Sequence, residues 1–189
     1  GFRSRVGVKV QDGCDNACTY CIVHVARGRA TSRPADEVTA ECVALAAAGV
    51  REIVLTGINL GSYCDGAKRD ASAMRLAGLL RRLLGETERL RAPGELPCRF
   101  RISSVEPRDV DDALVDLLAT ADGRICRHLH LPLQSGSSKV LREMARPYDA
   151  DQFRALVERL HAAVPGLALS TDIIAGFPGE TDVEFQETL

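Results

Sequence analysis

The chain has 189 residues, 46% of them hydrophobic, and a formal net charge of -2. Such a length and composition support one sizeable globular domain with an apolar core and exclude a disordered chain. They exclude a membrane-spanning protein, since no apolar run reaches the length of a membrane span. They also exclude a protein whose whole surface binds nucleic acid, since the net charge is near neutral.

Strand and helix patterns alternate through the first half of the chain. Residues 5–11 alternate valines with other residues, which predicts a strand, and the apolar run at 52–56 predicts a strand buried on both faces. Between them, a capped amphipathic segment predicts a helix that ends at Gly49. Leucines on one face of residues 73–84 predict a second helix, and Gly85 is expected to end it.

The same alternation continues in the second half. We expect strands at residues 99–105, 128–133 and 167–174 and helices at 110–120 and 149–163. Thr181 and Glu184 have the spacing of a capping box and open a fifth helix. Five β-α units in series predict an α/β fold with a parallel sheet and right-handed crossovers. A doubly wound sheet and a partial or complete barrel both satisfy this pattern.

Polar and glycine-rich segments follow each predicted strand. They are a cysteine-containing segment after the first strand, Thr56-Gly57 after the second, Ser103-Ser104 and Glu106 after the third, Gln134-Ser135-Gly136 after the fourth and residues 176–180 after the fifth. In both architectures, ligands bind at the carboxyl ends of the strands. The sequence therefore predicts a functional site along this edge, although glycine and serine are also ordinary turn residues.

Cys14, Cys18 and Cys21 have the spacing C-x3-C-x2-C. They supply three thiolates, one fewer than a closed four-iron cluster takes from protein, which would leave one iron open for a ligand. There are two alternatives: a structural zinc site with His24 as the fourth ligand, and a ferredoxin-like electron carrier, which needs a fourth cysteine. The position after the first strand, at the ligand-binding edge, favours the open cluster.

The chain has seven cysteines in total. We expect no secretory signal, and an odd number of cysteines fits a disulfide framework poorly, so the sequence predicts a reducing compartment and a cytoplasmic location. The cysteines outside the triad are expected to be small packing residues, and they are Cys42, Cys64, Cys98 and Cys126.

The triad, with Tyr20 directly before its last cysteine, resembles the signature of radical S-adenosylmethionine (SAM) enzymes. Further segments resemble blocks of the methylthiotransferases of that family, in the same order, at residues 26–34, 131–137, 144–148 and 171–181. Three stretches are similar to the branch that modifies threonylcarbamoyladenosine (t6A) in tRNA, at residues 11–16, 55–63 and 103–107. Together these segments span nearly the whole chain.

The resemblance implies a fold, a partial (β/α)6 barrel of the radical SAM type with about five β-α units present. It implies that residues 1–189 form an incomplete core domain that lacks the sixth unit. The family's amino-terminal domain, which carries a second 4Fe-4S cluster, and its carboxyl-terminal TRAM domain are also expected to be absent. The second cluster is accordingly expected only in a longer protein.

The resemblance also implies an activity. Cys14, Cys18 and Cys21 would hold a 4Fe-4S cluster whose open iron binds SAM. Reductive cleavage of SAM would start the addition of a methylthio group to C2 of t6A in tRNA, next to the anticodon. Isopentenyl-adenosine in tRNA and an aspartate of a ribosomal protein are alternative substrates, and a zinc-stabilised tRNA-binding module is the non-enzymatic alternative. The implied partners are tRNA and an electron donor such as flavodoxin or ferredoxin, with no membrane.

The resemblance assigns roles to residues around this cluster. Contacts to SAM are expected from Thr56, Gly57, Ser104, Gln134, Ser135, Arg146, Asp172 and Gly176. Arg27, Arg29 and Arg33 are expected where tRNA phosphates approach. Each has a plainer alternative as a turn-forming residue or a solvated arginine. The chain departs from the family pattern at His24-Val25, where relatives often have a proline and an aromatic residue.

Overall fold

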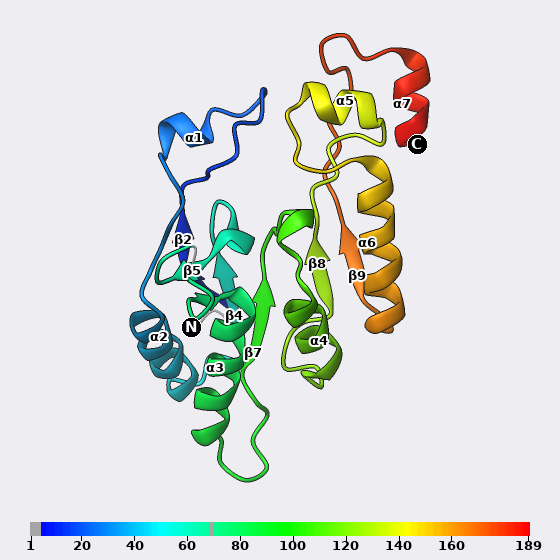
Figure 1. Cartoon of the computed structure of the whole chain (residues 1–189). Coiled ribbons are helices and arrows are strands. Elements are labelled where there is room, and N and C mark those ends of the chain that lie inside the picture. Colours follow the sequence, from blue (N-terminus) through cyan, green and yellow to red (C-terminus); the bar gives the residue numbers. More distant parts are fainter. Residues whose placement is uncertain (1–4, 69) are drawn as a thin grey trace.

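The computed structural model describes residues 5–68 and 70–189 (Figure 1). The first half contains a parallel sheet in the order β1-β4-β7, with β1 at Arg5–Lys9, β4 at Glu52–Thr56 and β7 at Arg99–Ile102. Helices α2 (Ala35–Ala47) and α3 (Leu76–Arg89) connect these strands and pack against each other. This half is therefore a β-α-β-α-β unit, as the alternating patterns predicted.

The main apolar core lies between this sheet and its helices. Ile53 and Leu55 of β4 are fully buried and lie in register with Phe100 and Ile102 of β7. The other face of β4 carries Glu52, Val54 and Thr56; Glu52 is buried by ion pairs with arginines, while Val54 and Thr56 are partly buried. The expectation of a strand buried on both faces therefore holds fully for one face and only in part for the other.

The second half adds a parallel pair of strands, β8 (His128–His130) and β9 (Ala168–Ser170). Strand β8 continues the sheet beyond β7 through an isolated bridge between Ser104 and His130. The amide of Val105 also donates to the carbonyl of His130 at 3.0 Å. The spatial order β1-β4-β7-β8-β9 confirms the predicted α/β fold with a parallel sheet, in the form of a partial barrel.

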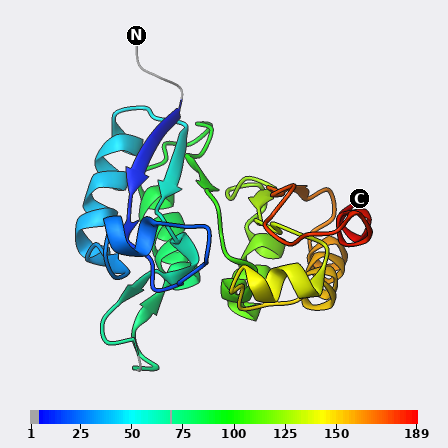
Figure 2. The same ribbon diagram turned by 90° about the horizontal axis from the view of Figure 1, so that it is seen from above.

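Four helices accompany this second half: α4 (Asp112–Thr120), α5 (Ser138–Glu143), α6 (Ala150–Ala163) and α7 (Asp182–Thr188). Helix α6 lies beside β9, and α5 and α7 stand above the carboxyl ends of the strands (Figures 1 and 2). The capping box of Thr181 and Glu184 opens α7 as predicted, and Asp149 and Gln152 form another at α6. Among the described residues, no helix is long and apolar enough to cross a membrane.

The structure corrects the predicted end of α3. This helix continues through Gly85 to Arg89, because Thr87 in the following turn is buried and its hydroxyl donates to the carbonyl of Leu83 at 2.7 Å. Helix α5 was not predicted, since six residues are too few to show a helical period. The cysteines expected to be packing residues are all buried, namely Cys42, Cys64, Cys98 and Cys126.

Candidate functional site

The three cysteines of the triad lie in one long loop, residues 13–30, which we call the cysteine loop. It stands above the carboxyl ends of the first strands and carries the short helix α1 (Val23–Ala26) (Figure 1). An antiparallel pair of β2 (Gln11–Asp12) and β3 (Thr31–Ser32) closes its base. The triad is therefore at the predicted edge of the sheet, but within a hairpin that its sequence did not reveal.

The base of the cysteine loop requires a glycine at position 13. Gly13 has a φ of +69°, and an added Cβ would lie 2.1 Å from the carbonyl oxygen of Arg29. The amide of Cys14 donates to the carbonyl of Gly28 at 3.1 Å. The two arms of the loop thus touch through backbone atoms, and no side chain at position 13 would allow this approach.

Gln11 joins the cysteine loop to the segment that follows β4. Its side-chain nitrogen donates to the carbonyls of Asp12 and Gly13 at 2.8 and 2.7 Å, and its oxygen accepts from the amide of Asn59 at 2.8 Å. A Cβ on Gly57 would lie 2.8 Å from that same oxygen. Gln11 was not predicted as a site residue. Its sequence context could have indicated one, because a polar side chain within a buried strand needs hydrogen-bond partners.

The triad consists of free thiols in different degrees of burial. Cys18 is 6% exposed, while Cys14 and Cys21 are half-buried. The sulfur of Cys14 accepts from the amide of Asn16 at 3.4 Å, and the sulfur of Cys18 accepts from Nη1 of Arg146 at 3.2 Å. Burial raises the pKa of the Cys14 thiol, against the Asn16 hydrogen bond that lowers it.

These side chains do not converge on the position of a single ion. Within residues 5–68 and 70–189, no three His, Cys, Asp or Glu side chains lie close enough together to hold one metal ion. Nδ1 of His24 is instead buried without a hydrogen-bond partner among the described residues. A four-iron cluster takes each thiolate on a separate iron and therefore needs a wider triad. Three free thiols with N–H donors at two of the sulfurs suit such a cluster.

The cysteine loop is tied to the second half of the molecule. The amide of Thr19 donates to the carbonyl of Met144, and its hydroxyl donates to the carbonyl of Glu143, both at 3.1 Å. Nη2 of Arg108 donates to the side-chain oxygen of Asn16 at 2.8 Å. The end of α5 and the start of the β7–α4 connection therefore hold the loop across the open side of the barrel.

Arg146 is buried beside Cys18 and makes the densest set of polar contacts at this edge. Its Nη2 binds Glu106 at 2.5 Å, and its Nη1 donates to the hydroxyl of Tyr20 at 3.1 Å. Its Nε and Nη2 donate to the hydroxyl of Tyr148 at 3.1 and 2.9 Å. Burial alone would lower the pKa of the guanidinium, but the charge of Glu106 and the phenol of Tyr148 raise it.

Two of the residues predicted to contact SAM lie together beside the loop. Thr56 and Gly57, at the end of β4, line a cavity of about 190 Å³. Arg27 and Gln11 line the same cavity from the side of the cysteine loop. The carboxyl end of β4 and the loop therefore share an opening, which is the arrangement that a ligand bound to both requires.

The predicted residues of the second half have different surroundings. Gln134 has a φ of +71°, a strained conformation for a residue with a side chain, and the carboxylate of Asp172 lies 3.2 Å from Nε2 of His130, from which it accepts when that nitrogen is protonated. Ser104 is exposed and Gly176 forms a turn with a φ of +74°. The hydroxyl of Ser135 is fully buried and accepts from the amide of Ser137, so its contacts in the structure are internal.

Three further polar groups lie at this edge, of which Ser103 was among the predicted strand-end residues, while Asn59 and Asp109 were not predicted as site residues. The buried side-chain oxygens of Asn59, Ser103 and Asp109 have no hydrogen-bond partner among the described residues. They follow β4 and β7, close to the cysteine loop, and burial raises the pKa of Asp109. Buried polar groups without partners are rare and mark places where water or a ligand completes the structure. Their signal in the sequence was only a polar residue after a strand.

The three arginines predicted to meet tRNA differ in their freedom. Arg33 binds Glu41 at 2.7 Å and donates to the carbonyl of Lys9 at 3.0 Å. Arg27 is 57% exposed and lies 3.9 Å from Asp12, while Arg29 is exposed. The charge of Arg33 is therefore matched locally, whereas Arg27 and Arg29 extend into solvent.

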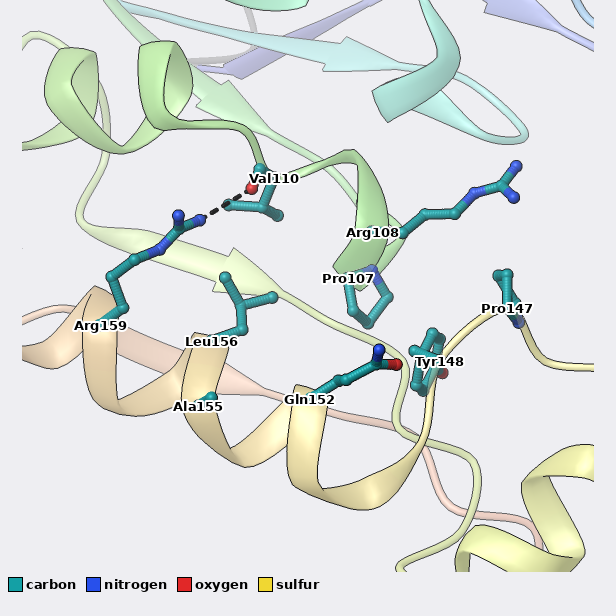
Figure 3. A pocket seen from close by; sticks show the side chains of 9 residues that line it. All are labelled: Pro107, Arg108, Val110, Pro147, Tyr148, Gln152, Ala155, Leu156 and Arg159. Carbon is teal, nitrogen blue, oxygen red and sulfur yellow. Dashed lines mark hydrogen bonds between the residues drawn. The ribbon is translucent and has the colours of Figure 1, made fainter.

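A larger cavity, about 450 Å³, lies between the β7–α4 connection and helix α6 (Figure 3). Its lining includes Pro107, Leu156 and Arg159, and the last of these donates to the carbonyl of Val110 at 2.9 Å. It shares Tyr148 with the surroundings of Arg146, and Arg108 of its lining donates to Asn16 of the cysteine loop. None of the three cysteines lines this cavity, and neither Thr56 nor Gly57 does, so we place the functional site at the loop despite the smaller opening there.

The chain is similar to several known proteins over most of its length. Two relatives named threonylcarbamoyladenosine tRNA methylthiotransferase MtaB, from Chlamydia pneumoniae and Bacillus subtilis, are 41% and 42% identical, over 99% and 98% of this chain. A tRNA-2-methylthio-N(6)-dimethylallyladenosine synthase from an Anaeromyxobacter species is 44% identical over 96% of the chain. The chain spans 41%, 39% and 36% of the lengths of these three relatives.

A solved structure supports the same fold. The radical S-adenosylmethionine methyltransferase TsrM from Kitasatospora setae, with cobalamin and a [4Fe-4S] cluster bound, matches with a TM-score of 0.71. It is 21% identical, and the match covers 94% of this chain and 32% of that one. The family model of the radical SAM superfamily matches residues 8–189, which is nearly the entire chain. The protein therefore belongs to the radical SAM superfamily.

Proposed function

We propose that this chain is the core of a radical SAM methylthiotransferase that adds a methylthio group to C2 of t6A in tRNA. The observation that carries the proposal is the cysteine loop, which holds three free thiols at the carboxyl edge of a parallel sheet. Relatives named as tRNA methylthiotransferases align over nearly all of the chain, which supports the choice of reaction.

Cys14, Cys18 and Cys21 are the residues that would hold the 4Fe-4S cluster, and its chemistry when bound is to supply the electron that cleaves SAM. The protein's own contribution is to position and shield the reactants. Gly13 and Gln11 fix the loop against the sheet, and the end of α5 holds it from the other side. This anchoring at both ends keeps the triad at a constant distance from the strand ends.

SAM would bind where Thr56 and Gly57 face the cysteine loop across the shared cavity. Gln134, in its strained backbone conformation, and Gly176 follow β8 and β9, so they would complete the site from the second half. The unpartnered oxygens of Asn59 and Ser103 supply acceptors for hydroxyl or amino groups of such a ligand. A flavodoxin or ferredoxin is the proposed electron donor.

The branch of substrate is a separate part of the proposal. Relatives named for t6A and for dimethylallyladenosine have nearly equal identity to this chain, at 41–42% and 43–44%. What favours t6A is the similarity of residues 11–16, 55–63 and 103–107 to that branch. Isopentenyl-adenosine in tRNA is the second candidate, because relatives with that activity in their names align equally well.

The test begins with anaerobic reconstitution of the protein with iron and sulfide. We expect about four irons per chain, a brown colour, and release of 5'-deoxyadenosine from SAM after reduction. One zinc and no SAM cleavage would instead identify the tRNA-binding module. Mass spectrometry of nucleosides from tRNA that carries either t6A or isopentenyl-adenosine then tests the branch, in the full-length protein. Methylthiolation of the latter alone would contradict the t6A assignment.

A further inference from the structure

Arg146 delivers a positive charge to one sulfur of the triad. Its Nη1 lies 3.2 Å from the sulfur of Cys18, and its side chain is only 3% exposed. The sulfur of Cys14 receives a neutral donor instead, the backbone amide of Asn16. Cys18 is therefore distinguished from Cys14 by a charged hydrogen-bond donor that cannot deprotonate.

The guanidinium has no donor left for a further ligand. Arginine carries five N–H groups, and here they meet Cys18, Tyr20, Glu106 and, twice, Tyr148. The hydroxyl of Tyr148 extends this hydrogen-bond network, since it donates to the carbonyl of Pro132 at 2.5 Å. A bidentate pair with the carboxylate of SAM would require breaking these contacts, so the geometry points to another role.

We propose that Arg146 is a positioning residue for the cluster: it fixes the sulfur of Cys18 and sets the cluster's reduction potential, with Glu106 as its counter-charge. The inference rests on the proposed function, because it requires a cluster on the triad. Reduction adds one negative charge to a cluster, and positive charge or N–H donors at its sulfurs favour the reduced form. The negative charge of Glu106 favours the oxidised form, so its ion pair with Arg146 reduces the amount by which Arg146 raises the reduction potential.

Two substitutions separate an electrostatic role from a merely structural one. Arg146→Gln and Glu106→Gln both break the same ion pair, so a structural role predicts changes of the same sign. An electrostatic role predicts opposite signs, because one variant removes a positive and the other a negative charge near Cys18. We expect Arg146→Gln to favour the oxidised cluster about tenfold, which is about 59 mV lower for a one-electron couple. Glu106→Gln is expected to raise the potential.

The experiment measures midpoint potentials of the reconstituted protein by an anaerobic redox titration followed by electron paramagnetic resonance. Arg146→Lys keeps the charge without the planar fork, and we expect its potential to lie nearer the wild type than that of Arg146→Gln. Arg124→Gln is the matched control, since Arg124 is 15% exposed and binds Glu88 at 2.6 Å. We expect it to lower the melting temperature without changing the potential.

A readout without the cluster completes the test. In the cluster-free protein, Tyr148→Phe and Arg146→Gln should lower the melting temperature, because both remove the connection from Arg146 to Pro132. Tyr148→Phe should leave the potential close to the wild-type value.

Equal potentials in all variants, or shifts of one sign in Arg146→Gln and Glu106→Gln, would overturn the inference. If Arg146→Gln does not fold, the same decision rests on Arg146→Lys and Glu106→Gln. A wild-type protein that takes up no iron would contradict the proposed function instead.

Discussion

Each edge of the parallel sheet has a buried charged group, and the two groups have opposite sign. At the amino edge, the Glu52 carboxylate is 5% exposed and binds Arg5, Arg99 and Arg101 at 2.6, 2.7 and 2.8 Å. At the carboxyl edge, the guanidinium of Arg146 is 3% exposed and is surrounded by a carboxylate, two phenols and a thiol. One edge gathers three cations around an anion, and the other gathers one anion and neutral phenol and thiol groups around a cation.

The two buried charges, Glu52 and Arg146, differ in where their binding partners lie in the chain, and this difference indicates what each one does. Arg5, Arg99 and Arg101 all come from β1 and β7, the strands that flank β4, so Glu52 fastens neighbouring strands of one sheet. The partners of Arg146 come from the cysteine loop, the β7–α4 connection and the segment after α5, three segments that are far apart in the sequence. The amino edge therefore contributes stability, and the carboxyl edge contributes an assembled site.

The largest effect is expected from Glu52→Gln. Removing one member of a buried ion pair leaves uncompensated charge, and we expect the free energy of unfolding to fall by about 3 kcal/mol, the lower end of the usual range, since the arginines are partly exposed. Chemical denaturation measures this. Glu88→Gln is the matched control, because Glu88 also binds two arginines but is 44% exposed, and it should cost less than about 1 kcal/mol. Equal losses in the two variants would remove the distinction between a buried and an exposed centre.

The second prediction concerns the base of the cysteine loop. Gly13 and Gly28 have φ angles of +69° and +76°, so alanine is strained at both, by about 1 kcal/mol. Only at position 13 would the new Cβ meet a backbone oxygen, while at position 28 nothing lies within 4 Å. Gly13→Ala should therefore cost about 2 kcal/mol more than Gly28→Ala and should release iron faster after reconstitution. Iron loss at the same rate in both variants would show that the loop base does not hold the triad.

These two centres also show how far the sequence predicts the molecule. The strands that carry Glu52 and its partners were predicted, because alternating or continuous apolar residues record burial locally. Helix α5 was not, because six residues are too few to show a helical period. Gln11 and most partners of Arg146 were not either, since these contacts join residues 40 to 128 positions apart in the chain. Thr19 and Met144 bond to each other across more than half of the sequence. Resemblance placed Arg146 near SAM, whereas in the folded chain its donors are directed to Cys18 and Glu106.

The third prediction is a pH dependence that belongs to the amino edge. Burial alone would raise the pKa of Glu52, but Arg101 and Arg99 lower it below its ordinary value of 4.5. A carboxyl whose pKa is depressed in the folded state stabilises fully above its unfolded pKa and loses this contribution as pH falls through the folded pKa. The free energy of unfolding should therefore decline below about pH 4.5, and Glu52→Gln should flatten that decline. Parallel curves for the two proteins would place the acid sensitivity elsewhere.

The smallest effect tests the outer surface of the carboxyl edge, where tRNA would approach. Arg29 is exposed, whereas the charge of Arg33 is matched by Glu41 at 2.7 Å. Replacing a free arginine that meets a phosphate lowers affinity and reduces the salt dependence of binding by about one unit of slope. We expect Arg29→Gln to weaken tRNA binding about fivefold at low salt, and Arg33→Gln to change it little, because Glu41 already neutralises that side chain.

Binding is measured by titrating labelled tRNA at several salt concentrations, so that affinity and slope are obtained together. A similar loss in both variants would mean that the ion pair with Glu41 opens on binding. An unchanged slope in Arg29→Gln would remove the cysteine loop from the tRNA interface. A loss of affinity in Arg29→Gln alone would distinguish two kinds of arginine. Those around Glu52 form ion pairs that stabilise the fold, whereas Arg29 is exposed and available to bind a polyanion.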